Sequence, residues 1–286
     1  MGATALTGDN AIAALGAFGA SQLEVRTLGD LRVTGPVAAT GALRLQAGGG
    51  MTLAGTVSGG SAWLQAGADL GAVEGGRIVA GSLSGRVGGR TALGTAAAPI
   101  DNRIDRIGDV VSPGGFSLSN GQSLTLGALD GSTYSIDAGT AAVALDVRGD
   151  LLQADRARLR DGTGTFSASG RIGTAALPVY VLGVGEQRAI AGMPPAYIDA
   201  VTADGRPLAV TGSGGGAPVV VALAGRVQHA ASHPGDAPAP GDPGDPGEAG
   251  TANADTSEPT VVGPGLRLPA DRARACEAGE RDCLAP

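Results

Sequence analysis

Apolar and polar residues alternate in short runs over the first two thirds of this chain. One phase of the alternation is aliphatic and comprises Leu31, Val33, Leu43, Leu45, Leu53, Leu124 and Leu126. The other phase is polar and comprises Arg32, Thr34, Arg44, Gln46, Thr52 and Thr125. A period of two predicts half-buried strands, and the Gly, Gly-Pro, Asn-Gly and Asp-Gly sequences between the runs favour tight turns. No stretch keeps a helical period over three turns.

The runs recur at a nearly constant step. Leu31-Arg-Val-Thr-Gly-Pro-Val37 returns as Met51-Thr-Leu-Ala-Gly-Thr-Val57, 20 residues on. Leu45-Gln-Ala-Gly48 returns as Leu64-Gln-Ala-Gly67, 19 residues on. This step predicts an all-β fold, a right-handed parallel β-helix (solenoid) with coils of about 19–20 residues stacked roughly 4.8 Å apart.

A longer echo and a change of composition divide the chain. Asn10-Ala-Ile-Ala-Ala-Leu-Gly16 returns as Asn102-Arg-Ile-Asp-Arg-Ile-Gly108, 92 residues on, which suggests modules that start near residues 10 and 102. The expected segments are a β-helical repeat region over 1–177, an irregular β-rich terminal segment or cap over 178–230, a Pro/Gly/Asp-rich disordered linker over 231–262, and a C-terminal tail over 263–286.

Composition and charge limit the classes of function that the sequence is compatible with. Aromatic residues make up 2% of the 286 residues, as suits a narrow interior of stacked aliphatic side chains. All 20 basic residues are Arg, and with 27 acids the net charge is −7, so we expect no nucleic-acid partner. No apolar stretch is long enough for a membrane span, and no signal peptide is evident. The sequence begins inside a module, so we expect a C-terminal fragment of a longer protein or a start codon assigned too late.

The tripeptide Arg148-Gly149-Asp150 is the candidate receptor-binding motif, because an exposed loop of this sequence can present a guanidinium and a carboxylate to an integrin-type receptor. The strings Leu28-Gly-Asp-Leu31 and Ile107-Gly-Asp-Val110 repeat its apolar-Gly-Asp-apolar pattern. The alternative is therefore a coil corner in which the aspartate stabilises the turn.

Cysteine and histidine are too few for a metal site. Cys276 and Cys283 are a candidate disulfide in an exported protein, with two free thiols as the alternative. His229 and His233 stand four residues apart, but the adjoining prolines exclude a helix that would bring them together. We therefore predict no metal and no cofactor.

β-Helical folds also host enzymes that cleave polysaccharides, which makes the acidic residues relevant. Asp101 and Asp105 are a candidate pair, yet they fall inside a repeat string, and the single tryptophan, Trp63, stands in an ordinary strand. Such enzymes gather acids and bases on one face, usually with aromatic platforms for sugar rings. We predict no catalytic residues and keep a carbohydrate-active β-helix enzyme as the alternative.

The strings that start at Asn10 and Asn102, together with Pro113-Gly-Gly-Phe-Ser-Leu-Ser-Asn-Gly-Gln-Ser-Leu-Thr-Leu126, resemble the repeat region of filamentous haemagglutinin-like proteins, which are large adhesins of Gram-negative bacteria. The resemblance covers about residues 8–175. It implies two-partner secretion through an outer-membrane partner, a β-helical shaft, and a secreted or cell-surface location. Adhesion, aggregation and biofilm contact are the roles that it implies.

Our leading expectation is therefore a non-enzymatic fragment of a secreted or cell-surface adhesin, whose ligand is a glycan or protein on a host-cell or bacterial surface. The first alternative is the carbohydrate-active enzyme, which predicts acids and arginines converging in a groove. The second alternative is a degenerate repeat fragment without independent function. Specific contacts are expected where the coils deviate from the repeat, around residues 128–165.

Overall fold

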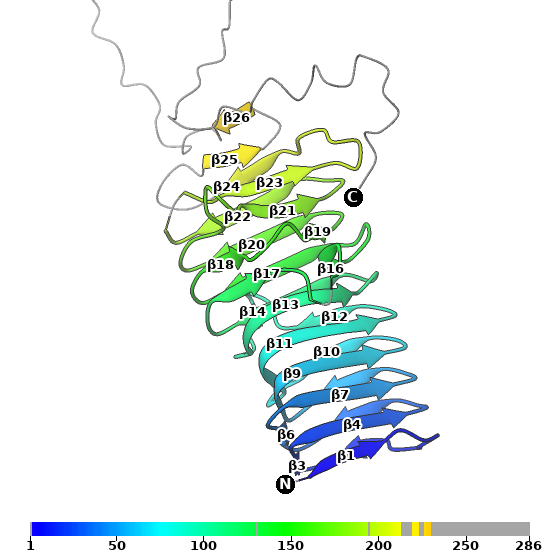
Figure 1. The fold of residues 1–286 in the computed structure, drawn as a ribbon. Helices are drawn as coiled ribbons and strands as arrows, with labels where there is room; N and C mark the ends of the chain where they lie inside the picture. Colours follow the sequence, from blue (N-terminus) through cyan, green and yellow to red (C-terminus); the bar gives the residue numbers. More distant parts are fainter. Residues whose placement is uncertain (1, 130, 194, 213–218, 223–225, 230–286) are drawn as a thin grey trace, which may run out of the picture. The chain divides into compact units, whose positions relative to one another are not determined.

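The computed structural model describes residues 2–212, except 130 and 194, together with residues 219–222 and 226–229. In these residues every regular element is a β-strand. Strands of successive turns pair in parallel and form a β-solenoid of about ten turns (Figure 1). The prediction of an all-β solenoid is confirmed.

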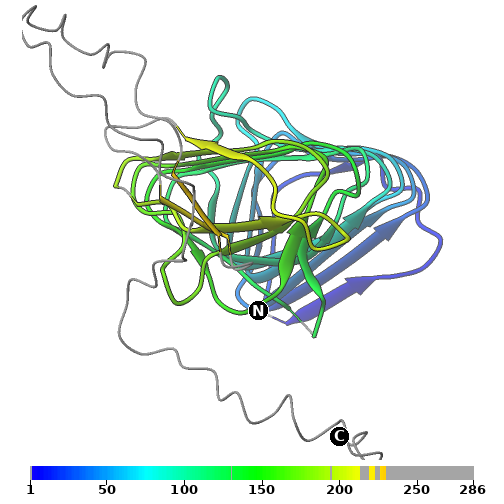
Figure 2. The same ribbon diagram turned by 90° about the horizontal axis from the view of Figure 1, so that it is seen from above.

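Two sheets form the walls of the solenoid, and each turn passes from one to the other. The 14 described strands of sheet A are β1 (Ala3–Leu6), β3 (Phe18–Ala20), β4 (Gln22–Thr27), β6 (Val37–Ala39), β7 (Ala42–Ala47), β9 (Thr56–Ala66), β11 (Arg77–Val87), β13 (Arg103–Val111), β15 (Leu124–Leu126), β16 (Tyr134–Asp137), β18 (Leu151–Gln153), β19 (Arg158–Arg160), β21 (Val179–Leu182) and β23 (Ile198–Val201). The 10 described strands of sheet B are β2 (Ala14–Leu15), β5 (Leu31–Val33), β8 (Met51–Leu53), β10 (Leu70–Ala72), β12 (Thr91–Leu93), β14 (Phe116–Asn120), β17 (Val143–Val147), β20 (Gly164–Ala168), β22 (Gln187–Ala191) and β24 (Val210–Gly212). Seen from above, the turns overlie one another around a common interior (Figure 2).

The pairing between early turns follows the repeats in the sequence. Leu31 pairs with Met51 in sheet B, and Leu45 pairs with Leu64 in sheet A. These partners are the first residues of the repeated strings, so each string lies directly over its own copy in the next turn. The short repeat thus predicted the register as well as the fold.

The turns lengthen in the middle of the solenoid. Thr91 pairs with Phe116, and Phe116 pairs with Val143, which are wider steps along the chain than those of the early turns. The additional residues enlarge the loops at 94–101 and 127–133. The coil length expected from the repeat therefore holds for the early turns only, and the solenoid absorbs insertions as loops outside its core.

Aliphatic side chains fill the interior. The seven leucines and valines predicted to face inward are at most 1% exposed, and their polar neighbours are exposed or half-buried. Phe116 and Phe166 add two aromatic rings to the interior. Leu, Val, Ile and Ala otherwise fill the space between the two sheets, so the interior is packed with few aromatic residues.

At one corner of the early turns, glycines of successive turns lie directly over one another, and their backbones are in close contact. Gly67 N donates to Ala47 O at 3.0 Å, and Gly88 N donates to Ala66 O at 2.9 Å in the next turn. A Cβ on Gly67 would collide with the carbonyl oxygen of Gly48, and one on Gly88 would collide with that of Gly67. Glycine at this corner, which follows Leu64-Gln-Ala66 in one turn and Arg86-Val87 in the next, is therefore required by the close approach of two turns.

The stack continues past the boundary expected at residue 177. Sheet A adds β21 and β23 in parallel register, and sheet B adds β22 and β24. Residues 178–212 thus add further turns to the solenoid. Val179 and Val181 keep the inward alternation although the sequence repeat has faded. An antiparallel hairpin of β25 (Val219–Ala222) and β26 (Arg226–His229) follows.

The echo between the strings at Asn10 and Asn102 does not mark equivalent places in the fold. Asn10–Gly16 contains β2, a strand of sheet B, whereas Asn102–Gly108 runs along β13 in sheet A. The similarity of the two strings reflects a shared alternation of aliphatic residues and not a module. The linker 231–262, the tail 263–286, His233 and both cysteines lie outside the described residues.

Candidate functional site

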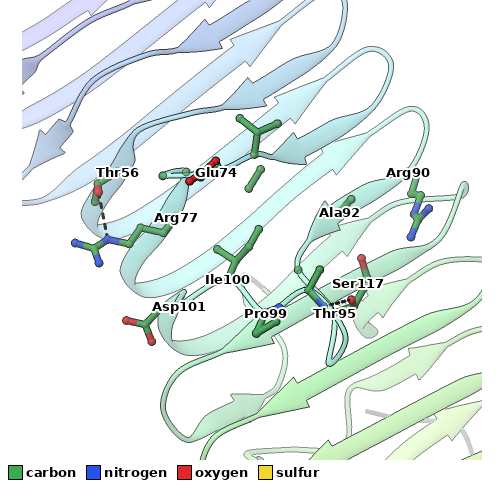
Figure 3. A pocket seen from close by; sticks show the side chains of 16 residues that line it. Thr56, Glu74, Arg77, Arg90, Ala92, Thr95, Pro99, Ile100, Asp101 and Ser117 are labelled. Carbon is green, nitrogen blue, oxygen red and sulfur yellow. Dashed lines mark hydrogen bonds between the residues drawn. The ribbon is translucent and has the colours of Figure 1, made fainter.

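An open groove of about 760 Å³ lies beside β12 and β14, at one of the lengthened coils (Figure 3). The turn 73–76, between β10 and β11, forms one wall, and the loop 94–101, between β12 and β13, forms the other. Gly75 and Gly94 have φ angles of +84° and +100°, which residues other than glycine rarely adopt. The insertion in this coil therefore creates the groove.

Four charged side chains line the groove: Glu74, Arg77, Arg90 and Asp101. Arg77 Nε donates to the hydroxyl of Thr56 at 3.2 Å. Figure 3 shows Arg77 and Asp101 toward one end and Arg90 toward the other. Among the described residues, no ion pair involves Glu74, Arg77 or Arg90. These side chains offer two guanidinium donors and a carboxylate acceptor to a ligand.

The base of the loop is held by a buried asparagine. Asn102 is 0% exposed, and its Nδ2 donates to Leu93 O at 2.8 Å and to Ser119 O at 2.9 Å. Its Oδ1 accepts from Ile78 N at 2.8 Å. Asn102 therefore ties three turns together where the loop 94–101 leaves and rejoins the wall. This places the groove on a fixed support.

Of the two acids considered for catalysis, one lines the groove and the other does not. Asp101 lines the groove, and its Oδ2 lies 3.3 Å from Arg103 Nε. Asp105 is exposed on β13, accepts a hydrogen bond from Gln122 at 2.5 Å, and does not line the groove. Asp101 is therefore the one acid of this pair that borders the groove.

The single tryptophan is also engaged elsewhere. The guanidinium of Arg44 lies 3.8 Å from the centre of the Trp63 ring, and Arg44 Nε lies 3.7 Å from a carboxylate oxygen of Glu24. This cation–π contact covers one face of the ring on the outer surface of sheet A. Trp63 does not line the groove and provides no aromatic platform there.

Arg148-Gly149-Asp150 forms a corner between β17 and β18. Arg148 is exposed, while Gly149 and Asp150 are half-buried. Asp150 Oδ1 accepts from Arg171 N at 2.8 Å, and its Oδ2 lies 3.4 Å from the Arg171 guanidinium. Asp150 N donates to the Ser123 hydroxyl at 3.0 Å. The carboxylate that a receptor would use is thus already bound to the next turn.

Two earlier aspartates each accept a hydrogen bond from a backbone N–H of the following turn, as Asp150 does. Asp30 Oδ1 accepts from Gly50 N at 2.7 Å, and Asp69 Oδ1 accepts from Arg90 N at 2.7 Å. The corner interpretation therefore describes Asp150 and Asp30 alike. Receptor binding by the tripeptide stays a prediction.

The third string with this pattern, Ile107-Gly-Asp-Val110, is built differently. The register between β11 and β13 shifts there, and Asp109 has a φ of +51°. Arg86 Nη2 lies 3.7 Å from Asp109 Oδ1. This is a β-bulge within a strand, so the same letters form a corner in one place and a bulge in another.

Glu74, Arg77 and Arg90 were not singled out from the sequence. The available signal was the loss of alternation at Thr95-Ala-Ala-Ala-Pro99, which lengthens a coil between two regular strands. The loop 127–133 overlaps the region 128–165 where deviation was expected, and it contributes Ser132 and Thr133 to a smaller hollow of about 240 Å³. The larger groove lies upstream of that region.

Comparisons of this chain with family models, with curated proteins and with solved structures find no match. Within the described residues, no helix has the length and hydrophobicity needed to cross a bilayer. The structure therefore establishes a β-solenoid repeat fold, and the function rests on the chemistry of its surface.

Proposed function

We propose that this chain is a non-enzymatic part of a secreted or cell-surface adhesin, in which the solenoid is a shaft and the groove beside β12 contacts a surface glycan. The observation that carries this proposal is the groove itself, which lies at a lengthened coil of the solenoid. The resemblance of the repeat strings to filamentous haemagglutinin-like proteins supports the adhesin class. Two-partner secretion belongs to the same proposal.

The chemistry of the groove favours a saccharide as its ligand. Its volume of about 760 Å³ suits a short stretch of a chain molecule, and its open form lets such a chain pass through. Arg77 and Arg90 donate to hydroxyl or carboxylate oxygens, and Glu74 accepts from hydroxyls. Uronic acid residues are the best match, because the two guanidinium groups have no carboxylate partner among the described residues.

Binding of polygalacturonate, with dextran as the neutral comparison, tests the groove. We expect the double variant Arg77→Gln/Arg90→Gln to bind polygalacturonate at least tenfold more weakly, because two charge-assisted contacts are lost. The matched control, Arg26→Gln/Arg32→Gln, removes the same charge from exposed positions outside the groove. An equal loss in both variants would show a general charge effect and contradict a site in the groove.

The same preparation tests the alternative of a carbohydrate-active enzyme, which Glu74, Asp101 and Arg77 in one groove specifically favour. Polygalacturonate incubated with the protein should keep its chain length. Shortening of the chain, abolished by Glu74→Gln or Asp101→Asn, would replace the adhesin proposal with an enzymatic one. Binding without cleavage, weakened only by the groove variant, is the result that the proposal requires.

A further inference from the structure

A buried acid and a buried amide meet between two late turns of the solenoid. Asp161 follows β19 and is 1% exposed, and Gln187 begins β22 and is 0% exposed. Gln187 Nε2 donates to Asp161 Oδ1 at 3.0 Å and to Gly185 O at 3.1 Å. Both amide hydrogens thus have acceptors. The opposite orientation of the amide would place Oε1 against two acceptors, so the orientation is determined.

The two remaining oxygens lie beside the same glycine and have no donor. Asp161 Oδ2 and Gln187 Oε1 are buried and have no hydrogen-bond partner. A Cβ on Gly164 would collide with Gln187 Oε1 and would lie 2.6 Å from Asp161 Oδ2. Both oxygens therefore converge on a spot that Gly164 leaves free. Two buried acceptors side by side are costly unless a hydrogen lies between them.

Glycine and apolar side chains enclose the pair. On its other side, a Cβ on Gly183 would lie 2.6 Å from Gln187 Nε2 and 2.8 Å from Asp161 Oδ1. Phe166 contacts the Gly164 position, and Leu208 contacts the Gly183 position. Burial in these surroundings raises the pKa of Asp161 to about 7, and the hydrogen bond from Gln187 acts in the opposite direction with smaller effect.

The charged groups of the adjoining elements are directed elsewhere. Arg158, Arg160, Glu186 and Arg188 are exposed, and Arg160 Nη1 lies 3.7 Å from Asp137 Oδ2. The other ionisable side chains on neighbouring strands and turns are Asp146 on β17, Tyr180 on β21, Asp199 on β23, and the exposed pair Asp204 and Arg206. Tyr180 and Asp199 alternate with the inward residues of their strands and so point away from the interior.

We propose that Asp161 and Gln187 share a proton in a closed ring of two hydrogen bonds that joins two turns. The carboxyl group is neutral, and its Oδ2–H donates to Gln187 Oε1 while Gln187 Nε2–H donates to Asp161 Oδ1. This proton gives both orphaned oxygens a partner without introducing a charge. Loss of the proton leaves a buried carboxylate and an unpaired amide oxygen between the turns.

The ring makes the contact between these turns dependent on pH. The unfolded chain releases the Asp161 proton near pH 4, whereas the folded turns hold it until about pH 7. The stabilisation is therefore complete below pH 4, declines as the pH rises from about 4 to about 7, and is absent above that range. This direction is opposite to that of a carboxylate held by an ion pair.

The direct test is the titration of the Asp161 carboxyl carbon by NMR in the whole chain labelled with ¹³C-aspartate. We expect a midpoint near pH 7, well apart from the ordinary aspartate value near 4. A midpoint at or below 4 would overturn the proposal, and would mean that a bound cation or solvent satisfies the two oxygens of an ionised pair. Assignment by comparison with Asp161→Asn identifies the resonance.

A second test measures the opening of residues 159–191 by hydrogen exchange, corrected for the intrinsic effect of pH. Opening should be at least tenfold more frequent at pH 8 than at pH 5, and up to about a hundredfold for midpoints near 4 and 7. Asp161→Asn keeps the ring, because its amide donates to Gln187 Oε1, and should abolish this difference. The same pH dependence in both proteins would contradict the proposal. If the variant fails to fold, the titration of the wild-type chain decides.

Discussion

Glycine is required in this solenoid where one corner passes directly over another. At Gly67 the nearest atom is the carbonyl oxygen of Gly48, and no rotamer change can move a backbone atom out of the way. At Gly71, on the neighbouring strand β10, nothing lies within 4 Å of the position that a Cβ would take. The two glycines have the same chemistry and opposite tolerance.

We therefore expect Gly67→Ala to destabilise the solenoid by about 1–3 kcal/mol, the usual range for overpacking. Gly71→Ala is the matched control and should change the free energy of unfolding by less than about 0.5 kcal/mol. Urea denaturation followed by circular dichroism measures both. Equal stability of the two variants would mean that the corners move apart easily.

Individual residues also show where sequence reasoning succeeds. The inward position of Leu31 or Leu45 follows from alternation, because strand geometry alone sends neighbours to opposite faces. The meeting of Asp161 and Gln187 does not follow, because they are 26 residues apart in turns whose repeat has faded. Nothing in the local sequence of either residue signals its partner.

At the scale of elements, the corners and loops decide what a string of residues does. Asn10 and Asn102 start similar strings, yet Asn102 is 0% exposed and makes three hydrogen bonds to buried backbone. Asn10 donates to Leu6 O, Gly8 O and Arg26 O at an exposed corner, where water is available. The asparagines of two similar strings therefore contribute differently to the free energy of unfolding, because one is buried and the other lies at an exposed corner.

Asn102→Ala should lower the free energy of unfolding by about 3 kcal/mol or more, because three buried backbone groups lose their partners. It should also weaken polygalacturonate binding, since the loop 94–101 loses its anchor. Asn10→Ala is the control and should cost less than about 1 kcal/mol, with binding unchanged. Thermal unfolding and the binding assay together check this, and equal effects of the two variants would refute it.

The groove was beyond sequence reasoning for a similar reason. A lengthened coil reveals that a loop exists at 94–101. It does not reveal that Arg77 at the start of β11 and Arg90 just before β12 border the same hollow. That arrangement depends on the path of the loop, which no period describes. The regular turns were predictable because each residue stacks on the equivalent residue of the next turn, a known number of positions further along the chain.

At the scale of the whole solenoid, each turn contacts mainly the turns on either side of it. Removal of residues 48–66 takes out one whole turn and joins Ala47 to Gly67, so that Leu70 can pair with Leu31 in place of Met51. The core and the register are then preserved. The free energy of unfolding of the solenoid falls only by the contribution of the missing turn.

We expect the chain without residues 48–66 to fold, with a circular dichroism spectrum of β-structure and a slightly lower melting temperature. Deletion of residues 48–57 alone is the control. It shifts the chain by half a turn, sets strands of sheet B against strands of sheet A and exposes inward side chains, so it should give an unfolded or aggregated product. Failure of both deletions would show that the turns are not interchangeable units.

The strands lie across the axis of the solenoid, and the hydrogen bonds between turns lie along it. A pulling force applied to its two ends therefore breaks the hydrogen bonds of a terminal turn one after another. The turns that are still stacked keep their structure. Each released turn of about 20 residues lengthens the chain by about 70 Å. The molecule consequently yields to tension gradually and in small increments, and it keeps most of its surface in place while its ends unwind.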